Sequence, residues 1–351
     1  MRVPRPDSAR SPRAAAVGIA LVILALAAAL SGCGGSSSAS SSSVGGSTAS
    51  DIAAANKVNL SDFPATDGSK TLAQIQKEAS AKADANVLPA SNDFVASREN
   101  RLPFGLFDLD RNAVWGPTVM YFAEGTDTPA YGPLAATAHA LDVPAKYRST
   151  TSQADYATIG NGYYTVHFTA PNGIKQLDIM TLTKNGSTTQ AATSGIILRP
   201  KDPSPAPGQA VPAIDTPTVQ SAGGDISKID TRVPHDNMHS ISLRDALKQH
   251  KPIVLIFATP ALCASRVCGP VVDVASEVQA KEGKNVIFIH NEIYKNNDVN
   301  AGYRPQVTAF GLTSEPFTFI IGPNGRVVQQ LQGPFDTAEL EAAINKAKAA
   351  K

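Results

Sequence analysis

The stretch that decides the fold is Ile253-Val-Leu-Ile-Phe-Ala-Thr-Pro-Ala-Leu-Cys263-Ala-Ser-Arg-Val-Cys268-Gly-Pro270. Its apolar beginning predicts a buried strand over 253–257, and the residues from 270 to 281 predict a helix that opens on a proline. Cys263 and Cys268 therefore lie on a strand-to-helix turn, beside a helix N-terminus. The positive end of a helix dipole favours the thiolate, which is the reactive form of cysteine. The pair is the first candidate for chemistry in this chain.

The third cysteine, Cys33, ends a predicted export signal. Residues 1–33 hold a basic leader, a mostly apolar run over 14–30, and the sequence Leu30-Ser-Gly-Cys33, which resembles a bacterial lipobox. The resemblance implies that Cys33 becomes the lipidated first residue. An uncleaved anchor is the alternative, although the run is shorter than the ~20 residues of a bilayer span. The predicted location is the cell envelope, lipid-anchored to the outer face of the membrane, where disulfides are permitted.

Composition divides the rest of the chain into five segments. Residues 34–68 predict a flexible Ser/Gly-rich tether, which cannot bury a core. A short helical segment is expected within 69–91. Residues 92–200 predict an all-β sandwich, 201–239 form a Pro-rich linker or spacer, and 240–351 predict an α/β domain.

The predicted sandwich consists of short strands separated by Gly, Asn and Pro turns, a pattern typical of antiparallel sandwiches. Residues 104–110 and 114–122 flank one such turn. The run 162–173 resembles part of the Ig-like modules of exported proteins, which implies an Ig-like sandwich. His139 and His167 lie in this segment, and we assign them no chemistry because a lone strand histidine is usually a surface or core residue.

The α/β segment has a definite element order. A cap at Ser242-Leu-Arg-Asp245 predicts a short helix, and Asp336 caps a final amphipathic helix. Between them come two apolar strands joined by the helix after the cysteines, and then a hairpin around the turn 322–325. A βαβ unit followed by a hairpin predicts a mixed sheet with helices on both faces.

Residues 240–351 resemble the thioredoxin family. Cys268-Gly-Pro-Val271 is similar to the family's Cys-Gly-Pro-Cys motif, but Val271 replaces the second cysteine, so Cys263 supplies the second thiol. Pro316 stands where thioredoxins carry a cis proline that faces the cysteines. The resemblance implies that Cys268, Cys263 and Pro316 are the catalytic residues, with Cys268 as nucleophile and Cys263 as resolving thiol.

One part of the thioredoxin pattern is missing. Thioredoxins bury an acid under the disulfide as a proton acceptor, whereas the strand 253–257 contains no acid. His290 and Asp273 are the candidates to replace it. The spacing of the pair also places Cys263 in a loop that must fold back, since five residues of regular helix would separate the two Cα atoms by roughly 7.5 Å.

Three functions remain open on the sequence alone. The first is thiol–disulfide exchange with thiol- or disulfide-containing exported proteins, which needs no cofactor. The second is copper binding, because the layout also resembles SCO-type copper chaperones. Here Cys263, Cys268 and His290 would be the metal ligands, with the segment 235–239 as another source, since Cu(I) prefers thiolates with imidazole. The third is a module in which the two cysteines form a structural disulfide.

Charge excludes one further class of function. Lys and Arg number 31 and Asp and Glu number 30, which gives a formal net charge of +1. No basic stripe with interleaved aromatic residues occurs in the chain. The sequence therefore predicts no nucleic-acid partner.

Overall fold

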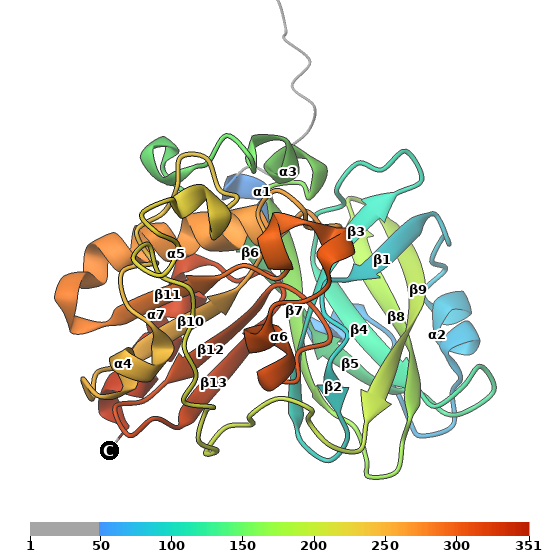
Figure 1. Ribbon diagram of the computed structural model, residues 1–351. Coiled ribbons are helices and arrows are strands. Elements are labelled where there is room, and N and C mark those ends of the chain that lie inside the picture. The colour runs from blue at the N-terminus through green and yellow to red at the C-terminus, as the bar shows by residue number, and fades with distance from the viewer. Residues whose placement is uncertain (1–48, 351) are drawn as a thin grey trace, which may run out of the picture. The chain divides into compact units, whose positions relative to one another are not determined.

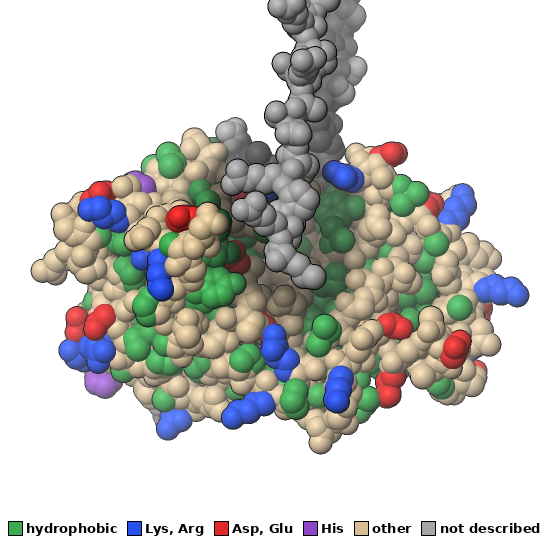
Figure 2. Space-filling model, turned by 45° about the vertical axis from the view of Figure 1, so that its right-hand side comes forward, with side chains coloured by type: hydrophobic (Ala, Val, Ile, Leu, Met, Phe, Trp, Pro, Cys, Tyr) green, Lys and Arg blue, Asp and Glu red, His purple; other side chains and the backbone are tan. Residues whose placement is uncertain are grey.

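The computed structural model describes residues 49–350 (Figure 1). The predicted export signal, Cys33 and the first part of the tether lie outside these residues. Among the described residues, no helix combines the length and the apolar character needed to cross a membrane. Charged side chains of both signs are dispersed over the face shown in Figure 2.

The described part of the predicted tether, 49–68, contains helices. From residue 49 onward the chain is ordered against the first β-sheets, where helix α1 (Ala49–Ala55) buries Ala55. Asn56 exchanges two hydrogen bonds with the backbone of Ala138. The helix expected within 69–91 is α2 (Leu72–Glu78), which Thr71 caps.

Two sheets follow, and each contains strands from distant parts of the chain. The five-stranded sheet has the order β2 (Phe94–Val95), β9 (Thr188–Arg199), β8 (Gln176–Asn185), β4 (Thr118–Ala123) and β5 (Tyr131–Ala135). The four-stranded sheet has the order β1 (Ala85–Pro89), β3 (Glu99–Asp108), β7 (Gly162–Thr169) and β6 (Thr137–Ala140).

A common core lies between these sheets. Phe104 and Tyr164 of one sheet and Phe122 of the other are fully buried in it. Two details correct the expectation from sequence. The segments beside the predicted turn, β3 and β4, belong to different sheets, and β2 pairs with β9 in parallel, so the strands are not all antiparallel.

The third sheet has the order β11 (Ile287–Asn291), β10 (Ile253–Phe257), β12 (Phe317–Ile321) and β13 (Val327–Gln332). The pair β10 and β11 is parallel, and the other two pairs are antiparallel. Helix α5 (Cys268–Glu282) makes the crossover between the parallel strands. This is the mixed sheet that the sequence predicts.

Helices cover both faces of this sheet, as predicted (Figure 1). Because side chains alternate along a strand, Val254 and Ile256 of β10 point to one face, where they share a core with α5 and α7 (Thr337–Ala349). Leu255 and Phe257 point to the other, which is covered by α4 (Leu243–Leu247) and α6 (Pro305–Ala309). Both predicted caps form, on Ser242 and Asp336.

The segment 201–239 is more than a spacer. Val211, Ile229 and Met238 are buried, and Ala210 forms a β-bridge with Arg326. The sequence of this segment is rich in proline and polar residues, so its burial could not be inferred from hydrophobic periodicity. It is packed onto the α/β part of the molecule.

A partly buried ion pair joins β3 to α7. The Arg101 guanidinium donates to both carboxylate oxygens of Glu339, at 2.8 and 2.7 Å, and to the Gln332 carbonyl at 2.9 Å. His139 lies beside it, with Nδ1 2.9 Å from the carboxylate of Asp336. These residues fix the start of α7 against β3 and β6.

Candidate functional site

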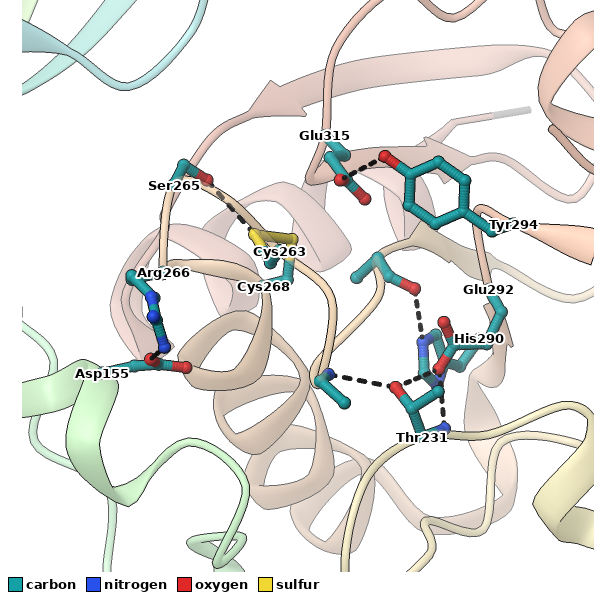
Figure 3. Close-up of a disulfide and its surroundings, with 12 residues drawn as sticks. Asp155, Thr231, Cys263, Ser265, Arg266, Cys268, His290, Glu292, Tyr294 and Glu315 are labelled. Carbon is teal, nitrogen blue, oxygen red and sulfur yellow. Dashed lines mark hydrogen bonds and ion pairs between the residues drawn. A yellow bond between two sulfur atoms is a disulfide. The ribbon is translucent and has the colours of Figure 1, made fainter. Parts of the chain in front are cut away.

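Cys263 and Cys268 form a disulfide (Figure 3). Their Cα atoms are 6.0 Å apart, within the usual range for a disulfide. The helix begins at Cys268, two residues earlier than predicted, and the preceding loop folds back to bring Cys263 to it. Gly269 lies where a Cβ atom would come within 2.4 Å of Ser152, so this position has no room for a side chain.

The two sulfur-bearing residues differ in exposure. Cys268 is fully buried, whereas Cys263 retains 7% of its surface. The Cys263 sulfur also lies 3.2 Å from the Ser265 hydroxyl. Cys263 is therefore the more exposed of the two residues.

Side chains from other segments contact the cysteine loop, residues 258–267, on two sides. Thr231 accepts a hydrogen bond from the Ala261 backbone N–H at 3.1 Å and donates one to Glu292 at 2.7 Å (Figure 3). On the other side, Arg266 pairs with Asp155 at 3.2 Å. These contacts restrict the loop between the strand and the helix.

Glu315 is the site residue that the sequence did not single out. The Glu315–Pro316 peptide is cis, and one carboxylate oxygen of Glu315 lies with both cysteine sulfurs in a group whose atoms are all within 4.8 Å of one another. The Tyr294 hydroxyl donates to Oε1 at 3.5 Å, while Oε2 is buried with no hydrogen-bond partner in the described part of the chain. Its position directly before Pro316 was the one clue in the sequence.

The surroundings of Glu315 change its acidity. Burial, with a smaller contribution from the Glu292 carboxylate, raises the pKa of Glu315 to about 7. A carboxyl group with such a pKa can both accept and donate a proton near neutral pH. Glu315 is therefore an acid beside the disulfide, whereas β10 contains none.

Glu315→Gln should change how stability depends on pH. The folded-state pKa is raised, so the wild-type carboxyl stabilises the fold below its unfolded pKa and loses that contribution as pH rises through about 7. We expect the variant to gain roughly 2 kcal/mol relative to wild type between pH 4 and pH 8, after allowance for partial exposure. Urea unfolding at both pH values measures this. The exposed Glu124→Gln serves as control, and an equal difference at both pH values would contradict the expectation.

The two acid candidates from the sequence are engaged elsewhere. Asp273 accepts hydrogen bonds from Arg232 Nε at 2.9 Å and from the Ser152 hydroxyl at 2.7 Å. His290 Nδ1 lies 2.8 Å from Asp236, and its Nε2 lies 3.1 Å from the Ala258 carbonyl. Neither belongs to the group formed by Glu315 and the sulfurs, and Figure 3 shows His290 apart from the disulfide.

This placement bears on the copper interpretation. The donor atoms gathered at the cysteines are two sulfurs and a carboxylate oxygen, without the expected imidazole of His290. Cu(I) prefers soft thiolates with imidazole or thioether, whereas carboxylate is a hard ligand. The residues at the cysteine pair therefore do not fit the predicted copper site.

A cleft of about 550 Å³ adjoins the cysteine loop. One wall is the loop itself, over residues 264–267. The remaining walls are mainly apolar and include Leu88, Phe107, Leu141, Ile159, Tyr163 and Pro334. The cleft thus offers an apolar surface next to the Cys263–Cys268 disulfide.

Fold and site together place a disulfide at the start of the helix that connects the parallel strands of a mixed four-stranded sheet. No protein-family model matches the chain, and a search of curated proteins finds no match. Among the solved structures that match is a thiol:disulfide interchange protein of the thioredoxin family from Chlorobium tepidum TLS. It has 19% sequence identity and a TM-score of 0.28, and the match covers 40% of this chain and 99% of that chain.

Proposed function

We propose that this protein carries out thiol–disulfide exchange through Cys263 and Cys268, as a lipoprotein anchored through Cys33 on the outer face of the membrane. One observation carries the proposal. A disulfide lies on the first turn of α5 with the carboxyl group of Glu315 among the sulfurs, all within 4.8 Å. A bond that served only as a structural link would not need an acid of pKa about 7 beside it.

Exposure and helix position assign the first step. The thiolate of a client protein attacks the Cys263 sulfur, which is the accessible one. The Cys263–Cys268 bond breaks, and its electron pair leaves on Cys268 as the client–Cys263 mixed disulfide forms. The N-terminus of α5 stabilises the departing thiolate, because the peptide dipoles present positive charge there.

Glu315 both donates and accepts a proton in this reaction. In its neutral form it donates a proton to the departing thiolate, and the carboxylate that remains can take a proton from an incoming thiol. A second client thiolate then attacks the client sulfur of the mixed disulfide and releases Cys263. The client loses two electrons and two protons, the protein gains both, and the reverse sequence reduces a client disulfide.

The clients that this proposal implies are exported proteins with paired cysteines. The apolar walls of the adjoining cleft would bind an apolar segment flanking the client cysteine. Burial of such a segment contributes about 25 cal/mol per Å² of apolar surface. No cofactor takes part.

The reduction potential of the Cys263–Cys268 pair is the decisive measurement. For an exchange protein we expect a potential above about −300 mV, together with reduction of insulin or turnover of a thiol reporter. A potential below that value, with no exchange in either assay, would identify the bond as a structural disulfide. The oxidised and reduced forms can be separated by alkylation after equilibration with thiol buffers.

A further inference from the structure

A second cluster of ionisable residues lies apart from the disulfide. Asp230, Asp236, His239 and His290 each contribute one possible ligand atom, and these four atoms lie within 4.8 Å of one another. Each of these residues is at most 5% exposed. We propose that this cluster is a closed binding site for a divalent cation of the zinc class.

The distances suit such an ion. A tetrahedral site with zinc–ligand bonds of about 2.0–2.1 Å has edges of roughly 3.4 Å. Here Asp236 lies 2.8 Å from His290 Nδ1 and 3.3 Å from His239 Nε2. Asp230 lies 3.8 Å from His239 Nε2 and 4.0 Å from His290 Nδ1. Small side-chain shifts would bring all four donors to one cation.

Neighbouring groups already orient three of the ligands. His290 Nε2 lies 3.1 Å from the Ala258 carbonyl, to which it can donate a hydrogen bond, so Nδ1 is left to face the cluster. This is the arrangement that commonly fixes a metal-binding histidine. The Asp230 carboxylate accepts the backbone N–H groups of Arg232 and Asp236, each at 2.8 Å, and Asp236 accepts that of Met238 at 2.7 Å.

His239 supplies an independent indication of a ligand. It is 1% exposed, and neither ring nitrogen has a hydrogen-bond partner within residues 49–350. Its Nε2 is directed toward the two carboxylates without hydrogen-bonding geometry. A buried polar group without a partner is unfavourable by roughly 1–3 kcal/mol, and coordination of a cation by Nε2 would remove most of that penalty.

Charge points to the same conclusion. The cluster brings two buried carboxylates, those of Asp230 and Asp236, together with two buried imidazoles. Two carboxylates and two neutral imidazoles around a dication sum to zero, which is the balance that a buried site requires.

The composition of the site indicates a structural role. Four protein ligands leave no open position for a substrate or water, as in structural rather than catalytic zinc sites. The ion would tie the segment 230–239 to β11, which carries His290. Since Thr231 of the same segment holds the cysteine loop at Ala261, the ion would also support that loop. His235, partly exposed and 3.4 Å from Asp230, lies at the edge of the cluster.

The test uses the full chain with its disulfide oxidised, so that the cysteines cannot bind metal. After treatment with a chelator, the protein is given Zn²⁺ or Co²⁺, freed of excess ion and analysed by elemental mass spectrometry. We expect one equivalent of bound ion, a visible spectrum of tetrahedral Co²⁺, and a higher melting temperature with Zn²⁺ because the ion binds the folded state. Failure of the wild-type protein to retain a stoichiometric ion would overturn the proposal.

Variants then identify the ligands. His239→Gln should weaken zinc binding by at least about 100-fold, while the exposed His250→Asn should bind as wild type does. A Cys263→Ser/Cys268→Ser double variant should also retain the ion, although it cannot exchange disulfides, so the two proposals fail separately. Retention of full affinity by folded His239→Gln, or loss of the ion in the double variant, would contradict the assigned ligand set.

Discussion

Cys268→Ser is expected to capture client proteins as stable mixed disulfides, whereas Cys263→Ser is expected to capture none. In Cys268→Ser the remaining thiol belongs to the more exposed of the two residues, and no second thiol is present to release the client. In Cys263→Ser the remaining sulfur is fully buried at the first residue of α5. Turnover in both variants should fall to the rate of the uncatalysed reaction.

The comparison requires envelope extracts or a model dithiol peptide, separated on non-reducing gels with and without reductant. The Cys263→Ser/Cys268→Ser double variant is the matched control for adventitious binding. Capture by Cys263→Ser alone would assign the nucleophile to Cys268, as the sequence motif suggested. Capture by neither variant, with an unreactive wild-type disulfide, would favour a structural bond.

The second large effect concerns stability. Asp273→Ala should lower the free energy of unfolding by about 3–5 kcal/mol, because it leaves the Arg232 guanidinium buried without its partner. Asp273 is fully buried and Arg232 is 4% exposed, and the pair lies 2.9 Å apart. The substitution also removes acceptors for the Ser152 hydroxyl and for the Ser149 backbone N–H. The substitution therefore removes contacts of α5 with the segment 149–152 and with Arg232.

Denaturant unfolding with the disulfide intact measures this difference. Asp245→Ala is the control, since Asp245 forms an exposed ion pair with Lys248 at 2.7 Å that contributes at most about 1 kcal/mol. A change of similar size in both variants would show that Asp273 is not a principal link of the fold. A normal pH profile of exchange in a folded Asp273→Asn variant would agree with Glu315 being the acid at the disulfide.

The sequence was most informative where neighbours along the chain determine the structure. The apolar run 253–257, the proline after Cys268 and the caps at Ser242 and Asp336 depend on local chemistry, and the strand-to-helix turn and both caps were predicted. The mixed sheet followed from the pattern of a crossover helix and a hairpin. By contrast, the turn before residue 114 gave no information about strand partners, and β3 and β4 lie in different sheets.

The site itself was only partly predictable, because its chemistry depends on residues far apart in the chain. Glu315 lies 47 positions after Cys268 and reaches the sulfurs through the turn at Pro316. The residues Asp230, Asp236 and His239 belong to a segment whose polar composition suggested exposure, but tertiary packing buries them. The spacing Asp-x5-Asp-x2-His was the available indication, and His290 at a strand end was its partner.

The cysteine loop depends on the segment 230–239, which limits how the loop could be grafted into another protein. Thr231 anchors Ala261, and Arg232 neutralises Asp273 in α5. A graft of residues 258–270 alone into another protein with a mixed sheet would lose both supports, and the Cys-x4-Cys loop would then sample open conformations. The smallest portable unit therefore consists of two separate pieces of chain, 230–239 and 253–282, together with the glutamate that precedes the cis proline.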